Sequence, residues 1–151
     1  MNYSAWCDGS ADNKNSLRPG GSAYIIFDSQ GNEVKRMSKG FTNTTSNRME
    51  LLAIVSVVNS LPYGSSVTIH SDSQYSINVL SGKWHASENL RQIELYRKLV
   101  AERNIKVTFE WVRGHNGDVY NELCDQMARG EYQKMLGKEE KVKKKSRRKK
   151  Q

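Results

Sequence analysis

The sequence has few cysteines and no long apolar run, and these absences exclude several classes of protein. Only Cys7 and Cys124 occur among 151 residues, too few for a disulfide scaffold, and we expect both to be small buried side chains in a reducing compartment. No stretch of about 18 apolar residues offers a transmembrane helix. The first ten residues lack the basic and continuous apolar segments of a signal peptide. We therefore expect one cytoplasmic domain that does not bind membranes.

Positive charge is concentrated at the C-terminal end. The net charge is +8, and residues 138–151 account for +7 of it, with nine Lys or Arg against two Glu. A segment so charged and without aromatic residues cannot bury an apolar face. The sequence therefore predicts a nearly neutral domain over residues 1–137 and a disordered basic tail over 138–151. Such a tail either aids solubility or binds a polyphosphate.

Hydrophobic periodicity and turn residues predict a single α/β domain with the element order βββαβααβα. Expected strands span residues 2–9, 22–28, 33–41, 66–71 and 105–112. The first expected helix is capped by one of residues 44–46 and is stopped by residues 61–64. Three further helices are expected over residues 73–80, 88–103 and 119–136. A hairpin-rich start followed by β-α units implies a five-stranded mixed sheet with helices on its faces.

Four acidic residues lie in four separate segments: Asp8, Glu50, Asp72 and Asp125. Three of them lie in or beside apolar runs, where an isolated carboxylate is costly to desolvate. Strand ends and helix starts can meet at one sheet edge, where ionised carboxylates would repel one another unless cations bind. Oxygen ligands of this hardness favour Mg²⁺ or Mn²⁺ over zinc. Two such cations about 3.5–4 Å apart could promote an in-line phosphoryl displacement.

Each carboxylate also has a purely structural interpretation. Asp72 could cap the helix that follows it, and Glu50 could favour the dipole at a helix N-terminus. Asp125 could pair with Arg129 four residues later. Taken together, the four positions favour a metal site more strongly than any one of them does.

A histidine, His115, lies in a glycine-flanked loop after a confident strand. Flexible backbone around an imidazole that titrates near neutral pH suits a mobile proton carrier. The alternative is an ordinary exposed loop histidine.

Four motifs resemble those of the type 1 ribonuclease H family, in the form that lacks a basic protrusion. They are CDGS (7–10), TSNRMEL (45–51), SDSQY (71–75) and WVRGHNG…NELCDQMA (111–128). They follow the family's order and spacing over about residues 2–134. The resemblance implies an RNase H-like fold. It also implies an endonuclease that cuts the RNA strand of RNA–DNA hybrids, leaving 3′-hydroxyl and 5′-phosphate ends.

The same resemblance implies roles for the site residues. Asp8, Glu50, Asp72 and Asp125 would hold two Mg²⁺ ions, with Mn²⁺ as a substitute, and Asp125 would be the more accessible ligand. His115 would assist water activation or product departure. A monomer without a small-molecule cofactor is the default expectation.

Contacts with the hybrid are implied as well. Positions matching minor-groove or RNA-strand contacts are Ser46, Asn47, Gln74 and Asn121. Glu50 would also accept a hydrogen bond from a ribose 2′-hydroxyl, a group that the shallow A-like minor groove exposes. Thr45 matches a pocket for a DNA phosphate.

Two features depart from many members of this family. The chain passes from Trp84 almost directly to the next helix, so the basic protrusion is absent. Trp84 could stack in the channel for the DNA strand or anchor the core. The tail over residues 138–151 could replace the protrusion as an electrostatic clamp on the hybrid.

Two other functions are compatible with the fold. One is a silent module that only binds nucleic acid, and the intact acidic set argues against it. The other is a different nuclease, such as a junction resolvase or an exonuclease. The motifs SDSQY and TSNRMEL, which match 2′-hydroxyl recognition, argue against that alternative.

Overall fold

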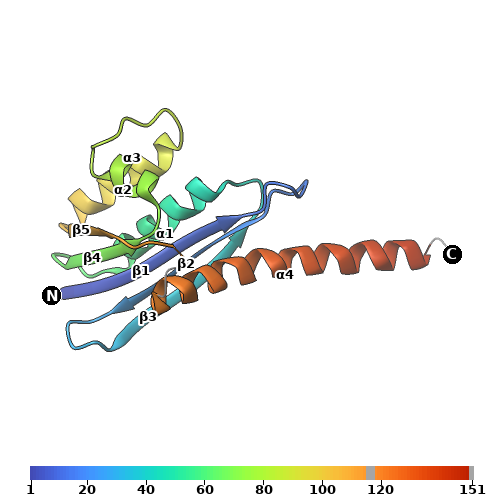
Figure 1. The fold of residues 1–151 in the computed structure, drawn as a ribbon, viewed down its shortest axis with the longest axis horizontal. Coiled ribbons are helices and arrows are strands. Elements are labelled where there is room, and N and C mark those ends of the chain that lie inside the picture. Colours follow the sequence, from blue (N-terminus) through green and yellow to red (C-terminus); the bar gives the residue numbers. More distant parts are fainter. Residues whose placement is uncertain (115–117, 150–151) are drawn as a thin grey trace.

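The computed structural model describes residues 1–114 and 118–149, the last of these (138–149) as backbone only. Its strands are β1 (Asn2–Ala11), β2 (Gly20–Phe27), β3 (Glu33–Phe41), β4 (Ser66–Ser71) and β5 (Lys106–Trp111). Its helices are α1 (Ser46–Ser60), α2 (Gln74–Leu80), α3 (Leu90–Glu102) and α4 (Val119–Lys149). The expected α/β fold with the order βββαβααβα is confirmed (Figure 1). None of the described helices combines the length and apolarity that a membrane span requires.

The five strands form one mixed sheet in the order β3-β2-β1-β4-β5. Strand β1 pairs antiparallel with β2 through Ala11↔Gly20, but its parallel pairing with β4 ends at Trp6↔His70. The two central strands therefore separate just before Asp8. Because β1, β4 and β5 are parallel, their carboxyl ends lie at the same edge of the sheet.

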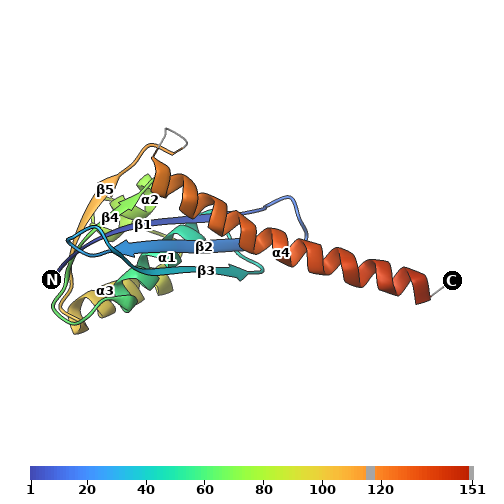
Figure 2. The same cartoon turned by 90° about the horizontal axis from the view of Figure 1, so that it is seen from below.

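Helices cover both faces of the sheet (Figures 1 and 2). Helices α1 and α3 lie on one face, and α4 crosses β1, β2 and β3 on the other. The larger core lies between the sheet and α1. A smaller one lies beneath α4, and its buried members are Ala23, Ile25, Phe27, Cys124 and Ala128. The sheet therefore packs against an apolar layer on each face, as expected for a domain of this length.

Helix α1 forms where its cap and apolar stripe predict it. The Thr45 side chain accepts a hydrogen bond from the backbone N–H of Arg48 at 3.2 Å, which satisfies one free donor of the first turn. The expected stripe is fully buried: Leu51, Ile54, Val55 and Val58. The helix stops at Leu61, directly before Pro62.

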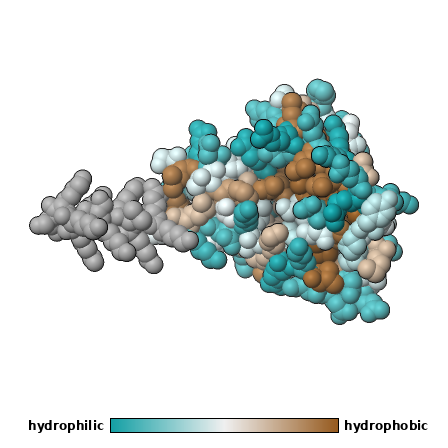
Figure 3. Space-filling model, turned by 180° about the vertical axis from the view of Figure 1, so that it is seen from behind, coloured by the Kyte–Doolittle hydropathy of each residue, from teal (hydrophilic) through white to brown (hydrophobic). Residues whose placement is uncertain are grey.

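An apolar hollow of about 290 Å³ lies between the sheet and α1, on the side of β3. Apolar residues that line it are Tyr24, Met37, Phe41 and Leu52. Figure 3 shows apolar side chains gathered in a band across one face of the domain. Among the described residues, those that line the hollow include none of the expected site residues. The hollow is thus separate from the acidic positions.

In the body, the largest boundary differences from expectation are in the β1–β2 hairpin, where β2 begins at Gly20 rather than residue 22, and at the start of α3. Strand β1 runs to Ala11 rather than ending at residue 9, because its hairpin with β2 continues to Gly20. Helix α3 begins at Leu90, two residues later than expected. The preceding Asn89 has a left-handed backbone (φ 59°), a conformation that Asn tolerates but that interrupts a helix.

The largest difference concerns the C-terminal segment. Helix α4 continues to Lys149, whereas the sequence predicts disorder from residue 138. Lys, Arg and Glu are good helix formers, and the segment contains no proline. It also extends a helix that the domain has already nucleated, which removes the most costly step of helix formation. Its backbone projects beyond the sheet (Figures 1 and 2).

Candidate active site

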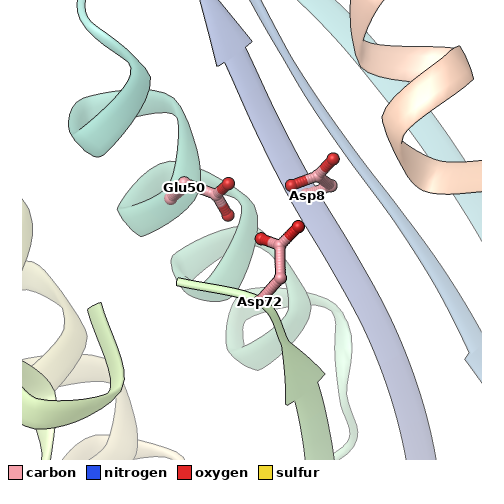
Figure 4. A group of neighbouring side chains, drawn as sticks. All are labelled: Asp8, Glu50 and Asp72. Carbon is pink, nitrogen blue, oxygen red and sulfur yellow. The ribbon is translucent and has the colours of Figure 1, made fainter. Parts of the chain in front are cut away.

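Three of the four predicted carboxylates meet at the edge where β1 and β4 separate. Asp8 lies on β1, Glu50 on α1, and Asp72 directly after β4. One oxygen from each lies within 4.8 Å of the others, and the three side chains point toward one another (Figure 4). Asp8 and Glu50 are only 2% and 8% exposed. The structure thus brings together acids from three segments that are distant in sequence.

Close packing of β1 against α1 positions Glu50. A side chain at Gly9 would overlap the backbone of Met49 and Glu50, so only glycine permits this approach. The nearby Gly9 N–H lowers the pKa of Glu50, against the effect of burial. Ser22 Oγ donates to the Met49 carbonyl at 2.7 Å and ties α1 to β2. Because α1 begins at Ser46, Glu50 lies beyond the first turn, so the interpretation of Glu50 as a residue that favours the dipole at the helix N-terminus is wrong.

Asp72 does not cap the helix that follows it. Ser73 takes that role, and its hydroxyl accepts a hydrogen bond from the Ser76 N–H at 3.1 Å. The Asp72 backbone is held instead by the Trp111 indole, which donates to the Asp72 carbonyl at 3.3 Å. Gly114 leaves room for the carboxylate, since a Cβ there would come within 3.0 Å of Asp72 Oδ2. The side chain is therefore free to face the site.

Asp125 lies beside this group on α4 but is not one of the three. Buried Cys124, whose thiol approaches the Trp6 carbonyl at 3.4 Å, places this turn of α4 against β1. Asp125 is close enough to Asp8 to raise the pKa of that residue. Its Oδ2 also pairs with Arg129 Nε at 3.2 Å, so the structural interpretation of Asp125 is confirmed together with its proximity to the site.

The buried acids retain protons more readily than ordinary carboxyls. Burial raises the pKa of Asp8 to about 8, and the Asp72 charge adds to this, while a hydrogen bond with Glu50 opposes it. Burial and the Asp8 charge raise the pKa of Glu50 well above its usual value. Glu50 Oε2 is buried and lacks a hydrogen-bond partner among the described residues. Converging buried acids with an unsatisfied oxygen fit the ligand set of a hard divalent cation.

The predicted substrate residues on helix starts are accessible. Ser46 and Asn47 are exposed in the first turn of α1, one turn before Glu50. Thr45 is exposed and caps the same helix. Gln74 is exposed at the start of α2, two residues after Asp72. These side chains are therefore exposed within about one turn of Glu50 on α1 and of Asp72 before α2.

The remaining predicted residues have three different outcomes. Asn121 is buried (3% exposed), and its Oδ1 has no partner within the described part of the chain. Trp84 is 50% exposed in the segment between α2 and α3, which contradicts its alternative role as a core anchor. His115 lies outside the described residues.

Sequence reasoning missed an aromatic stack on β1 and β4, the two strands that carry or precede Asp8 and Asp72. Trp6 and His70 stack with ring centroids 4.0 Å apart and planes 3° from parallel. His70 also contacts the Ala5 carbonyl through Nδ1 at 3.0 Å and Glu110 through Nε2 at 3.1 Å. The available signal was strand periodicity, since residues two apart on a strand share a face. Trp6 precedes Asp8 by two residues on β1, so these two side chains share the face of the sheet that α4 covers.

The surroundings of Cys7 on β1 were also not predicted in detail. Cys7 is buried and its thiol approaches the His70 carbonyl at 3.8 Å. Burial raises the pKa of both Cys7 and Cys124, so each thiol stays protonated in the folded protein. The expectation of small, buried cysteine side chains is confirmed.

Comparisons with known proteins agree with this geometry. The sequence model of the family described as RNase H matches residues 2–133. The chain is 35% identical over 143 residues to a ribonuclease H from Lachnoclostridium phytofermentans, covering 85% of this chain and 90% of the relative. It is 36% identical over 122 residues to ribonuclease HI from Pasteurella multocida, covering 74% and 78%.

Solved structures show the same fold at lower sequence identity. RNase H1 from Halobacterium salinarum superposes with a TM-score of 0.73 at 18% identity, covering 87% of this chain and 97% of that one. LC11-RNase H1, solved in complex with an RNA/DNA hybrid, gives a TM-score of 0.77 at 19% identity, covering 89% and 99%.

Proposed function

Because this chain belongs to the RNase H family and is a ribonuclease H, an enzyme that cleaves the RNA strand of RNA–DNA hybrids, we propose that it is an endonuclease using two divalent cations. The observation that carries the cation proposal is the meeting of Asp8, Glu50 and Asp72 within 4.8 Å. The products would carry 3′-hydroxyl and 5′-phosphate ends.

The acidic residues would hold the cations. Asp8, Glu50 and Asp72 supply the converging oxygens, and Asp125 adds a fourth carboxylate next to Asp8. When bound, two Mg²⁺ ions, or Mn²⁺ in their place, would activate water and neutralise charge on the leaving oxygen. Loading the site requires Asp8 and Glu50 to release the protons that burial favours, so cation binding and proton release are coupled.

The residues around the acids would orient the hybrid. In this proposal Ser46, Asn47 and Gln74 contact the minor groove, and Glu50 also accepts from a ribose 2′-hydroxyl. Their exposure on two helices beside the acids supports it. Reading 2′-hydroxyls selects RNA without selecting a base sequence.

Further contacts complete the substrate site. Thr45 would bind a DNA phosphate, Asn121 the RNA strand, and exposed Trp84 would stack along the DNA strand. His115, between β5 and α4, would carry a proton during water activation or product departure.

The proposed catalytic domain is residues 1–137, and the family match over residues 2–133 supports that boundary. We propose that it acts as a cytoplasmic monomer without a small-molecule cofactor. The two buried, unpaired cysteines support a reducing compartment.

A substrate panel tests this function. Labelled RNA–DNA hybrid, duplex DNA and duplex RNA are incubated with Mg²⁺, with a chelator, and with the Asp72→Asn variant. We expect internal cuts in the RNA of the hybrid alone, abolished by chelator and by the substitution, while hybrid binding by the variant survives. Binding of the hybrid by the wild type without cleavage would show a silent module, and cleavage of duplex DNA would show a different nuclease.

A further inference from the structure

Helix α4 connects the candidate active site to the basic C-terminal segment without a break. It runs from Val119 to Lys149 and carries Asp125 near its start. We propose that its last part, residues 138–149 (the basic arm), is a helical arm of fixed direction that binds duplex nucleic acid away from the cleaved bond. This inference rests on the proposed function, because the duplex is the hybrid substrate itself.

Contacts with β3 fix the direction of α4 just before the arm begins. A Cβ on Gly40 would lie 2.9 Å from Met135 Sδ, so the helix lies directly on the strand there. Ser38 Oγ donates to Glu131 at 2.9 Å one helical turn earlier. The last of these contacts precedes the arm by three residues. The arm therefore leaves the domain in a direction that the sheet determines (Figure 2).

The charge distribution identifies a polyanionic partner. Residues 138–151 carry +7 of the net charge of +8, so the body itself has almost no net attraction for a polyanion. Like charges at helical spacing repel one another in isolation. Phosphates of a duplex would relieve that repulsion, and their neutralisation releases counterions. The arm would thus supply most of the salt-dependent affinity.

The helix also sets how far from the cut the arm can act. At about 1.5 Å per residue, the arm begins about 20 Å and ends about 36 Å along the helix from Asp125. At about 3.4 Å per nucleotide along a strand, those distances correspond to roughly six to eleven base pairs. A duplex shorter than this on the arm's side would reach the carboxylates but not the arm.

Gly137 allows the direction of the arm to be tested without changing its charge. Nothing lies within 4 Å of a Cβ built on this residue, so alanine fits there. Gly137→Ala favours the helix, whereas Gly137→Pro interrupts it by removing a backbone donor and clashing with the preceding turn. Insertion of Gly-Ser-Gly-Ser after residue 137 is a second interruption that does not strain the body. Circular dichroism and Tm confirm that the domain of each variant is folded.

The substrate is a DNA duplex with a short central RNA run, flanked on each side by about four or about fourteen base pairs. For the wild type and Gly137→Ala, we expect KM to be on the order of tenfold lower on the long duplex. If the arm neutralises about four phosphates, the plot of log(1/KM) against log salt concentration should have a slope about 3 to 4 more negative for the long duplex than for the short one. Both interrupted variants should lose this preference and resemble the chain truncated after residue 137, with kcat unchanged.

Two results would overturn the inference. One is a wild-type KM that does not depend on flank length. The other is a length preference that survives both interruptions, which would mean that charge acts without a fixed direction. Cleavage of the RNA run by every variant at saturating substrate keeps the proposed function intact in either case. Failure of the wild type to cleave the RNA run in either duplex would instead refute the proposed function.

Discussion

Gly9 and Glu50 lie against each other where β1 touches α1, so closely that a Cβ built on Gly9 would overlap the backbone nitrogen of Glu50. This contact sets the distance between Asp8 and Glu50, which belong to different elements. The position of the site therefore depends on a residue that has no side chain.

Gly9→Ala should disrupt the site. The added methyl group would push α1 away from β1, costing about 1–3 kcal/mol of stability. We expect cleavage to fall by about 100-fold, the typical effect of a displacement of about 1 Å in a catalytic group. Urea unfolding and single-turnover cleavage measure the two effects. As a control, Gly130→Ala in α4, where a Cβ meets nothing within 4 Å, should gain about 0.5–1 kcal/mol and keep its activity. Full activity in Gly9→Ala would contradict the proposed constraint.

Stability without metal should fall as pH rises. Burial raises the pKa of Asp8 to about 8 and raises that of Glu50, so the folded state holds protons that the unfolded state loses near pH 4. The stabilising contribution is complete below that pH and is lost as pH rises through the folded pKa values. In chelator, we expect Tm to drop by roughly 5 °C or more between pH 5 and pH 9, given about 2–4 °C per kcal/mol at this chain length.

Asp8→Asn provides the matched comparison for this pH dependence. It removes the titrating group while keeping a similar volume, so its Tm should vary less with pH and exceed that of the wild type above pH 8. Saturating Mg²⁺ should also reduce the drop in the wild type, because the cation replaces the protons. Parallel Tm curves for the two proteins would count against the raised pKa of Asp8.

If Asp125 binds a cation as proposed, Arg129 competes with that cation for the Asp125 carboxylate. The Arg129–Asp125 contact of 3.2 Å is partly exposed, so it contributes no more than about 1 kcal/mol. We expect Arg129→Gln to tighten Mg²⁺ binding about two- to fivefold in titration calorimetry, which falls within that limit. Arg36→Gln, which removes a comparable surface pair with Glu33, should leave Mg²⁺ binding unchanged. Weaker binding in Arg129→Gln would mean that the arginine positions Asp125 instead.

Trp84 should contribute to hybrid binding and only moderately to stability. Because half of its surface is exposed, Trp84→Ala should lower the free energy of unfolding by about 1–2 kcal/mol, less than the about 3–5 kcal/mol typical of a core tryptophan. Loss of stacking should raise KM about five- to tenfold at unchanged kcat, as expected for about 1–1.4 kcal/mol per stacked base. Tyr63→Ala, at a more exposed aromatic residue, should alter neither parameter. An unchanged KM for Trp84→Ala would show that Trp84 does not contact the hybrid.

Much of the site could be predicted from sequence because strands place it. Asp8 lies near the carboxyl end of β1, and Asp72 directly follows the parallel neighbouring strand β4, so their meeting at one edge follows from element order alone. The placement of Glu50 could not be predicted in the same way. It depends on the closeness of α1 to Gly9, a tertiary distance that no local pattern encodes.

The C-terminal segment illustrates two sequence signals in conflict. Its charge and lack of aromatic residues predict disorder, while its Lys, Arg and Glu content favours a helix. Composition cannot decide between them, since the outcome depends on whether a preceding helix is already anchored. The contact of Met135 with Gly40 provides that anchor, and it is visible only in the folded chain.

The two buried thiols give this enzyme a built-in reporter of opening. Cys7 precedes Asp8 and is buried in the larger core on the α1 side of the sheet, whereas Cys124 precedes Asp125 and is buried between β1 and α4. The rate of alkylation at Cys124 therefore measures how often this seam between β1 and α4 separates, and the rate at Cys7 measures opening of the larger core. Comparing the Cys124 rate with and without hybrid would show whether substrate closes the seam.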